Sequence, residues 1–534
     1  MAREATTLPV PPPPSGFLAL MRNRNYALLW ASQGVSQLGD RFHWVAISLW
    51  VYAVTQSALA VSYAIIALMV GPAVVGLFAG ALVDRWNRKR TMVVSDLIRG
   101  ALVALIPWLM TRSLLLVYLD LFLVSCASTF FRPAMLASIP RIVSKTELMP
   151  ANSFLATVDT GTEVIGPLAA GFFVQARGYS QAMYFDAGSY FLSALLVGFL
   201  SLPGASSRVA GVMKEATGIL ADIKEGWRYI RKDRLQFGLL MFIFLGWWVS
   251  GLNSVQTPLA KAEFGLSDAE FGWFNSVWGI GFVAASLVLG WYGRRIPAGR
   301  LIATGFLGWA VATGITGLSL NSGMLYAAVF WVGFANIALF IGLSTTIMEV
   351  TPSEMLGRVI AIRQVSLTAV RLAAMVGFGY MADHIGIRES VLGMAGLSLV
   401  GLLLGLRLFP EVSRFGSPGA VPHKDGRRRA MPDLSRVVHV LIDATDPAYP
   451  NVPQRRLNVV VSIIVGAVWI ALLIRNPGPA IYIAGIVASA VILKVALTWW
   501  KERGSTNVRQ PRTEPGRESE EVGRSPVATG PTAR

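Results

Sequence analysis

Three ionisable side chains, Asp40, Glu163 and Arg371, lie inside long apolar stretches of this 534-residue chain. A charge in such a stretch is costly unless it faces the protein interior, so these residues are the first candidates for chemistry. A buried carboxylate can take up a proton in a dry surrounding and release it when its site is hydrated. We therefore expect Asp40 and Glu163 to bind protons, and Arg371 to attract an anionic substrate or neutralise a carboxylate.

Two more titratable groups share helix faces with these carboxylates. Asp159 precedes Glu163 by four residues and His43 follows Asp40 by three, and both spacings place the paired side chains on one side of a helix. Asp159 and His43 are therefore further proton-coupling candidates. The alternative for these charges is a permanent ion pair with Arg371 that locks helices together.

The elements that hold these residues must be membrane helices. Hydrophobic residues make up 54% of the chain and charged residues only 14%, which is far more apolar than a soluble domain. Lys and Arg cluster between the apolar runs, so membrane topology explains the net charge of +17 without a nucleic-acid partner. The single cysteine, Cys126, excludes an intrachain disulfide, and no histidine metal motif is present, so we expect neither a metal nor a cofactor.

Roughly twelve apolar runs are long enough to span a bilayer. They begin near Tyr26, Leu59, Thr91, Leu114, Ser153, Ala182, Leu235, Phe271, Leu301, Leu325, Val359 and Val391, and two more near Leu457 and Pro479 predict a C-terminal hairpin. The expected organisation is a disordered arm (1–24), a six-helix bundle (25–202), a cytoplasmic linker with an amphipathic helix (203–234), a second six-helix bundle (235–410), a basic cytoplasmic segment with an amphipathic helix (411–456), the transmembrane hairpin (457–500) and a disordered tail (501–534).

The charges of the connecting segments also predict orientation. Basic residues occur in alternate connections. This pattern places those connections and both termini on the cytoplasmic side of the cell (plasma or inner) membrane. The two halves resemble copies, because the basic turn after Gly80 has a weak echo at Gly290–Arg295, and Glu147-Leu148-Met149 matches Glu354-Met355-Leu356. Repeated halves of six helices are typical of alternating-access transporters.

Gly80–Arg90 resembles the loop G-x-x-x-D-R-x-x-R-K/R between helices two and three of the major facilitator superfamily. Ser36–Asp40 and Thr55–Ala58 are similar to the branch that contains enterobactin and macrolide exporters, and the resemblance runs from about Asn25 to Pro410. It implies an all-α membrane protein of two pseudo-symmetric six-helix bundles, the major facilitator fold, here followed by the hairpin. The intramembrane carboxylates in turn imply a proton gradient as the energy source.

The resemblance gives the basic turn the role of a conformational latch that stabilises the outward-facing state. The residues that match are Gly80, Asp84, Arg85, Arg88 and Lys89. The latch would meet the start of the eleventh helix, at Gly357-Arg358. The alternative is that the basic residues only enforce topology and bind lipid headgroups.

A second motif, Gly161–Gly171 in the fifth helix, resembles the family's antiporter motif. Gly161, Gly166 and Gly171 permit close helix contact, and Pro167 frees a backbone carbonyl and bends the helix. The motif therefore predicts a packing pivot, although helix packing alone also accounts for these residues. It departs from the family form, which usually ends in Gly-Gly where this chain has Ala170-Gly171.

In the family fold, helices one, five and eleven line a central cavity, so the resemblance implies that Asp40, Glu163 and Arg371 converge. Further candidates for the substrate walls are Asn253, Gln256, Asn275, Trp278 and Asn336. We expect Asp96 and Arg99 to join the cytoplasmic charges, Arg41 to form a helix-packing or outer-half pair, and Arg132 either to reach the membrane surface or to contact substrate.

The function that these features predict is secondary export of an amphipathic small molecule of drug, macrolide or siderophore type, coupled to protons. A lysophospholipid or lipid transporter is the alternative within transport, and a membrane-bound receptor or enzyme is the alternative outside it. No G-x-x-x-x-G-K-[ST] or H-E-x-x-H sequence is present, so we do not expect an enzyme. The expected partners are membrane lipid and the substrate, with a monomer or an undefined oligomer.

Overall fold

The chain folds into long helices. The computed structural model describes residues 17–201 and 224–416, and within these ranges it contains no strand. All residues that the structure describes belong to one compact unit. The predicted C-terminal hairpin, the basic segment before it and the tail lie outside the described residues.

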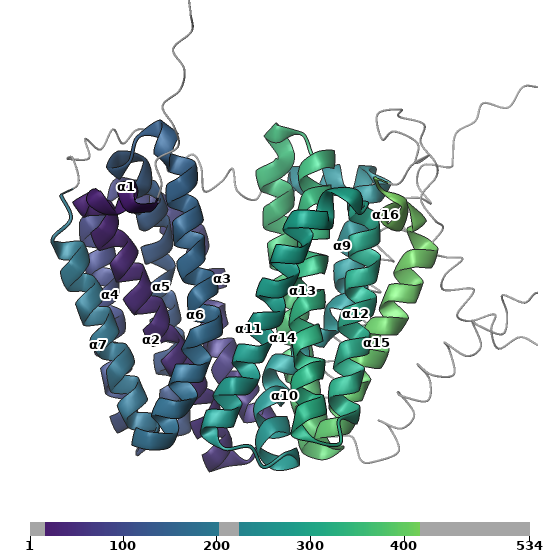
Figure 1. Ribbon diagram of the computed structural model, residues 1–534, viewed down its shortest axis with the longest axis horizontal. Helices are drawn as coiled ribbons and strands as arrows, with labels where there is room; N and C mark the ends of the chain where they lie inside the picture. The colour runs from purple at the N-terminus through teal and green to yellow at the C-terminus, as the bar shows by residue number, and fades with distance from the viewer. Residues whose placement is uncertain (1–16, 202–223, 417–534) are drawn as a thin grey trace, which may run out of the picture. The chain divides into compact units, whose positions relative to one another are not determined.

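Six long helices form the N-terminal bundle, drawn in purple and blue in Figure 1. They are α2 (Arg24–Thr55), α3 (Ala58–Arg85), α4 (Arg88–Met110), α5 (Leu114–Ile142), α6 (Leu148–Arg177) and α7 (Tyr179–Gly198), after a short α1 (Phe17–Arg22). Within the bundle α2 packs against α6 and α7, while α4 packs against α5 and α7. The polar residues of α2 therefore face α6 and α7 rather than lipid.

The second bundle repeats this plan with one broken helix. Its first membrane crossing is built from α9 (Arg234–Gly246), η2 (Trp247–Gly251), α10 (Leu252–Pro258) and η3 (Leu259–Glu263). The amide of Val249, freed where the α-helix tightens, donates to Ser398 Oγ of α15 at 3.1 Å. The remaining elements are α11 (Asp268–Tyr292), η4 (Gly293–Arg295), α12 (Ala298–Leu318), α13 (Ser322–Val350), α14 (Ser353–His384), α15 (Ile387–Leu408) and α16 (Pro410–Arg414).

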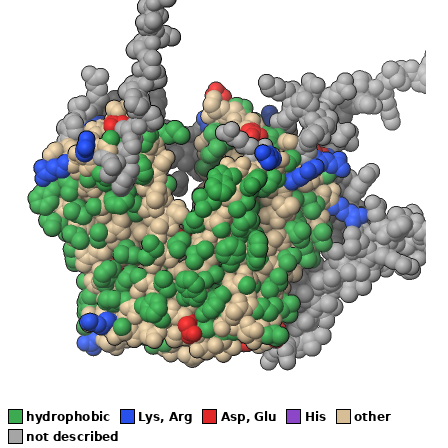
Figure 2. Space-filling view, in the orientation of Figure 1, with side chains coloured by type: hydrophobic (Ala, Val, Ile, Leu, Met, Phe, Trp, Pro, Cys, Tyr) green, Lys and Arg blue, Asp and Glu red, His purple; other side chains and the backbone are tan. Residues whose placement is uncertain are grey.

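The surface agrees with a membrane setting. Among the described helices, nine are long and apolar enough to cross a bilayer. The other three long helices are α2, α6 and α7, which contain the carboxylates Asp40, Glu163 and Asp186. Hydrophobic side chains cover the middle of the face in Figure 2, and Lys and Arg gather at its upper and lower edges. The predicted all-α membrane fold of two six-helix bundles is confirmed.

The two bundles contact each other where α3 begins and α14 ends. Asp383 of α14 accepts hydrogen bonds from the amides of Ala58 at 2.6 Å and Leu59 at 3.2 Å. The same carboxylate accepts a hydrogen bond from Ser57 Oγ at 2.5 Å. One turn further along α3, Ser62 Oγ donates to the carbonyl of Met375 at 3.0 Å. A carboxylate of one bundle therefore caps a helix of the other, where the helix dipole favours negative charge.

Replacing Asp383 with alanine is expected to separate the bundles at this end. Loss of a helix cap costs about 0.5–2 kcal/mol, so this conformation should lose roughly two- to thirtyfold in population. Pulsed electron paramagnetic resonance measures the separation between spin labels at the exposed positions Arg177 and Ala262, in a Cys126→Ser background. Glu349→Ala removes an exposed carboxylate elsewhere and serves as control, and equal distance distributions for both variants would contradict the prediction.

Candidate functional site

A polar pocket of about 260 Å³ lies inside the N-terminal bundle. It is lined by Gln33, Ser36, Gln37, Asp40, Arg41, Arg99, Ser128, Phe131, Arg132 and Asp159. These residues come from α2, α4, α5 and α6, so four helices contribute to one site. Two carboxylates and three guanidinium groups line this pocket between membrane helices. The pocket is therefore built to hold a polar group or a proton.

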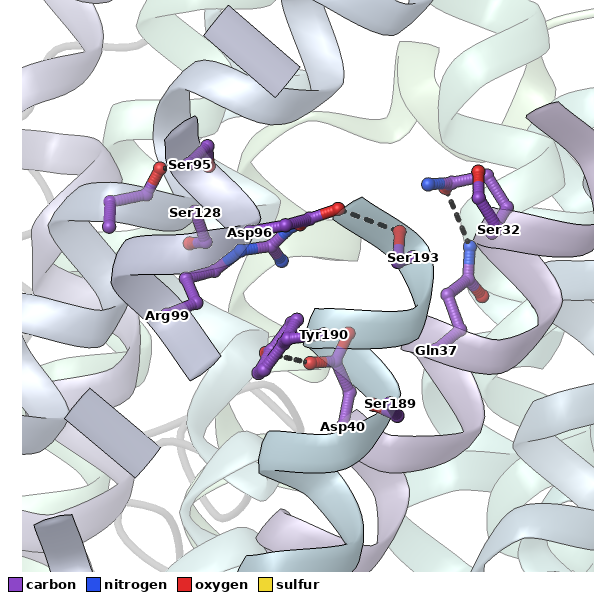
Figure 3. Close-up of polar contacts among 12 residues, drawn as sticks. Ser32, Gln37, Asp40, Ser95, Asp96, Arg99, Ser128, Ser189, Tyr190 and Ser193 are labelled. Carbon is purple, nitrogen blue, oxygen red and sulfur yellow. Dashed lines mark hydrogen bonds and ion pairs between the residues drawn. The ribbon is translucent and has the colours of Figure 1, made fainter. Parts of the chain in front are cut away.

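Asp40 is held on one side of this pocket by α7. Figure 3 shows Tyr190 directed toward Asp40, and its hydroxyl donates a hydrogen bond to the Asp40 carboxylate. The Arg99 guanidinium lies over the Tyr190 ring, 4.3 Å from its centroid, and forms a buried ion pair with Asp96. Ser193 Oγ completes the group by donating to Asp96 at 2.6 Å.

Arg99 corrects one expectation. Assignment of Arg99 to the cytoplasmic charges is wrong, because its side chain lines the pocket and is buried. The helix begins at Arg88, so Arg99 lies eleven residues, or about 16 Å, into α4. That depth is close to mid-membrane.

Glu163 lies beside the pocket and forms an ion pair with Arg41, which lines it. Its carboxylate accepts a hydrogen bond from the Arg41 guanidinium across the α2–α6 contact, and each side chain is 30% exposed. Gly166 makes room for this pair, because a Cβ there would lie 2.5 Å from Cγ of Arg41. The helix-packing pair expected for Arg41 is thus present, with Glu163 as its partner.

Asp159 occupies the pocket one turn before Glu163. Gln37 donates a hydrogen bond to its carboxylate, and the guanidinium of Arg132 lies 3.6 Å away. Arg132 is 70% exposed, so its contact with Asp159 is open to solvent. Asp40, Asp159 and Glu163 are therefore gathered in or beside one pocket.

His43 lies elsewhere. Its Nδ1 is 2.9 Å from the Asp186 carboxylate of α7, and both side chains are buried. The spacing of three residues does place Asp40 and His43 on one side of α2, but Tyr190 contacts the first and Asp186 the second. Sequence reasoning missed Asp186, although it is a carboxylate within an apolar run, the same signal that selected Asp40.

The candidates in the C-terminal bundle are not brought to this pocket. Nε of Arg371 is buried without a hydrogen-bond partner among the described residues. Asn253 donates to the Ser250 carbonyl at 3.0 Å, and Asn275 donates to the Phe271 carbonyl at 2.9 Å. Both amides bond to their own helix, an option that spacing along the sequence does not reveal. Gln256 is buried, Asn336 is half-buried, and the Trp278 ring lies 5.9 Å from that of Phe282.

The basic turn is described in part. Gly80, Asp84 and Arg85 lie outside the residues whose surroundings the structure describes, and Lys89 is half-buried. Arg88 donates to the Ala137 carbonyl of α5 at 2.8 Å.

The start of α14, where the latch is expected to bind, is held by another segment. Residues 224–232 are helical, and Glu225 there pairs with Arg358 at 3.0 Å. A Cβ on Gly226 would lie 2.9 Å from Ile362 and 3.0 Å from Arg358, whereas a Cβ on Gly357 would meet nothing within 4 Å. In this conformation the linker helix, therefore, contacts the start of α14.

The glycine motif of α6 contributes to the second contact between the bundles. A Cβ on Gly171 would lie 2.5 Å from the Asp268 carbonyl and 2.8 Å from Cα of Gly272, both in α11. The Pro167 carbonyl lies against Gly272 in the same seam, whereas a Cβ on Gly161 would meet nothing within 4 Å. Close packing of α6 on α11 thus depends on the end of the motif that contains Gly171.

A larger, apolar groove of about 550 Å³ lies on the C-terminal bundle, between α11, α12 and α13. Its walls include Val288, Leu301, Met324, Trp331 and Phe334. In the described ranges no group of three or more His, Cys, Asp or Glu side chains is arranged to hold a metal ion.

Comparison with known proteins agrees with this architecture. The model of the Major Facilitator Superfamily matches residues 29–259 and 237–499, so the match continues past Pro410, where the motif resemblance was expected to end. The uncharacterized MFS-type transporter YfiS of Bacillus subtilis is 28% identical over 399 residues, 72% of this chain and 93% of that protein. Macrolide efflux protein A of Streptococcus pyogenes is 21% identical over 72% of this chain and 96% of its own length.

The chain is also similar to a known exporter in sequence and to a solved transporter structure in fold. The enterobactin exporter EntS of Citrobacter koseri is 28% identical over 71% of this chain and 89% of that protein. A crystal structure of the nucleoside transporter NupG has a TM-score of 0.62 at 11% identity, covering 72% of this chain and 99% of that one. With matched regions spanning both bundles, the chain belongs to the Major Facilitator Superfamily and is a multi-pass membrane transporter.

Proposed function

We propose that this transporter exports an amphipathic small molecule of drug, macrolide or siderophore type in exchange for protons, by alternating access. The observation that carries the proposal is the polar pocket, in which Asp40 and Asp159 lie among Arg41, Arg99 and Arg132. Carboxylates near arginines inside a membrane can exchange a proton for an ion pair as the site is hydrated. The names of the macrolide and enterobactin exporters support the direction and the substrate class.

The described conformation fits one state of such a cycle. The bundles contact each other at the end that holds Asp383 and Gly171. If the basic turn after Gly80 is cytoplasmic, as its charge predicts, this closed end faces outward and both termini are cytoplasmic. We assign this conformation to the inward-facing state, in which the latch is not required.

A lipid or lysophospholipid transporter is the second candidate. The observation that favours it is the apolar groove between α11 and α13, whose volume of about 550 Å³ suits an acyl chain better than a polar drug.

Purified full-length protein in proteoliposomes, with an imposed pH gradient and an internal pH indicator, tests both candidates. Addition of a macrolide or enterobactin is expected to start a proton flux across the membrane of the proteoliposomes, and protein-free liposomes should show no such flux. Asp40→Asn should lower this flux at least tenfold, and Glu349→Gln should leave it unchanged. Flux with lysophosphatidylcholine alone would support the second candidate. Absence of compound-dependent proton flux in a panel of such compounds would refute proton-coupled export.

A further inference from the structure

Three titratable side chains outside the polar pocket meet in the interior of the N-terminal bundle. His43 of α2 is 3% exposed, Asp120 of α5 is 3% exposed and Asp186 of α7 is fully buried. Nδ1 of His43 lies 2.9 Å from Asp186 Oδ2, and α5, which holds Asp120, packs against α2 so that a proton on His43 would act on the Asp120 carboxylate. The cluster is enclosed by three different helices, so it is part of the fold and not a solvated surface group.

The two sides of the imidazole differ in their partners. Both carboxylate oxygens of Asp186 have a polar neighbour: Oδ2 lies 2.9 Å from Nδ1 of His43, and Oδ1 lies 3.3 Å from Ser189 Oγ, which also lies 2.7 Å from the Asp186 carbonyl. Nε2 of His43 and Oδ2 of Asp120 are both buried, and neither has a hydrogen-bond partner in the described part of the chain. A buried carboxylate oxygen without a donor is costly, and one added proton relieves that cost. The unpartnered atoms therefore identify where a proton would bind.

The cluster lies near the end of the N-terminal bundle at which α5 and α7 begin. Asp120 lies six residues after the start of α5, and Asp186 seven residues after the start of α7, or about 9–10 Å along each helix. Both helices start at the end of the bundle where Asp383 caps α3. This end faces outward in the proposed orientation, so the cluster lies nearer the outer surface than the polar pocket does.

The cluster is also linked to the pocket through α7. The charges of Asp40 and Arg99 act on Asp186, and those of Asp40 and Asp186 act on Tyr190. Tyr190 follows Asp186 by one turn and donates its hydrogen bond to Asp40. Asp120 is influenced by His43, and no other charge is found to act on it within the described residues. Asp186 and Tyr190, one turn apart on α7, thus connect the cluster to Asp40.

We propose that Asp120, His43 and Asp186 form a proton-binding site separate from the polar pocket, which takes protons from the outer side and transmits their charge to Asp40. The proton forms a new N–H bond at Nε2 of His43 or a new O–H bond at Oδ2 of Asp120, and no other bond changes. The role in coupling rests on the proposed proton-driven export, whereas the binding site itself does not.

Nuclear magnetic resonance of ¹⁵N-histidine protein in lipid nanodiscs tests the site without substrate. The chain has four histidines, and His43→Gln assigns the relevant signals. The His43 signals are expected to differ between acid and neutral pH if the cluster binds a proton, and Asp120→Asn should alter that difference, because Asn can neither bind the proton nor carry the charge. Glu349→Gln should cause no shift. An unchanged His43 transition in folded Asp120→Asn protein would overturn the proposal.

A measurement on the unsubstituted protein covers the case in which Asp120→Asn does not fold. Infrared difference spectra recorded between acid and neutral pH, with ¹³C-labelled aspartate, are expected to contain a buried carboxyl band that titrates together with the His43 signals. Absence of any aspartate band that follows His43 would overturn the proposal.

Transport separates this proposal from the broader one. In folded Asp120→Asn protein, coupled proton flux should fall at least tenfold while the affinity for the exported compound stays within twofold. If the His43 and aspartate signals of the unsubstituted protein change together with pH but no coupled proton flux is measured, the proton-binding site is supported and proton-coupled export is refuted. Coupled flux without that titration would refute the site and retain the export function.

Discussion

Adding a single methyl group at Gly171 is expected to open the contact between α6 and α11. The Cβ of Gly171→Ala would lie 2.5 Å from the Asp268 carbonyl and 2.8 Å from Cα of Gly272, and backbone atoms cannot rotate away as a side chain can. Overpacking of this kind costs about 1–3 kcal/mol. The closed-end conformation should therefore lose roughly five- to 150-fold in population relative to the alternative state.

The same spin-label pair at Arg177 and Ala262 measures this shift. Gly188→Ala is the matched control, because a Cβ on that exposed glycine of α7 would meet nothing within 4 Å. Both substitutions favour the helix by about 0.5–1 kcal/mol, so helix propensity cannot account for a difference between them. If Gly171→Ala and Gly188→Ala gave the same distances, the α6–α11 seam would not control the conformation.

Glu163→Gln is expected to abolish proton coupling while retaining substrate binding. The amide keeps the shape of the carboxylate but cannot carry the charge that pairs with Arg41 or bind a proton in the relevant range. Compound-driven proton flux in proteoliposomes should fall to the level of protein-free vesicles, and the compound's Kd should change less than threefold. Glu349→Gln controls for the loss of one carboxylate.

The double variant Arg41→Gln/Glu163→Gln distinguishes a coupling role from a structural ion pair. Loss of one partner leaves an uncompensated charge, which costs roughly 3–5 kcal/mol in fully buried pairs and less here, since both side chains are 30% exposed. Removal of both partners should restore thermal stability but not coupled flux. If the double variant regained coupling, or if Glu163→Gln never lost it, the pair would serve only to hold α2 against α6.

The membrane helices were predictable because a bilayer requires a minimum apolar length, and each run meets it locally in the sequence. The break at Trp247–Gly251 was not, since it contains no proline and is stabilised by Ser398, about 150 residues away. Positions of side chains within the pocket also depend on such distant partners. Tyr190 and Asp40 are separated by 150 residues, and nothing in the spacing of either helix predicts their contact.

Two misses have different physical causes. Arg99 was assigned to the cytoplasmic charges although the predicted helix start near Thr91 is close to the observed start at Arg88; its contact with Tyr190, 91 residues away, could not be seen in the sequence. Asp120 and Asp186 carried a usable signal, since each is a carboxylate within an apolar run, as Asp40 is. The candidates in the C-terminal bundle stay predictions; among them, Asn253 donates a hydrogen bond to the Ser250 carbonyl within its own membrane crossing, an option that any polar residue in a membrane helix has.

The Asp383 cap means that α3 is completed by two parts of the protein. Ser57, in the same bundle as α3, accepts a hydrogen bond from the amide of Ala60. The amides of Ala58 and Leu59 instead donate to Asp383 of the C-terminal bundle. In the proposed alternating-access cycle, water would replace that carboxylate when the bundles separate and would leave when they meet. The hydration of the first turn of α3 would then change in every cycle and contribute to the barrier between states.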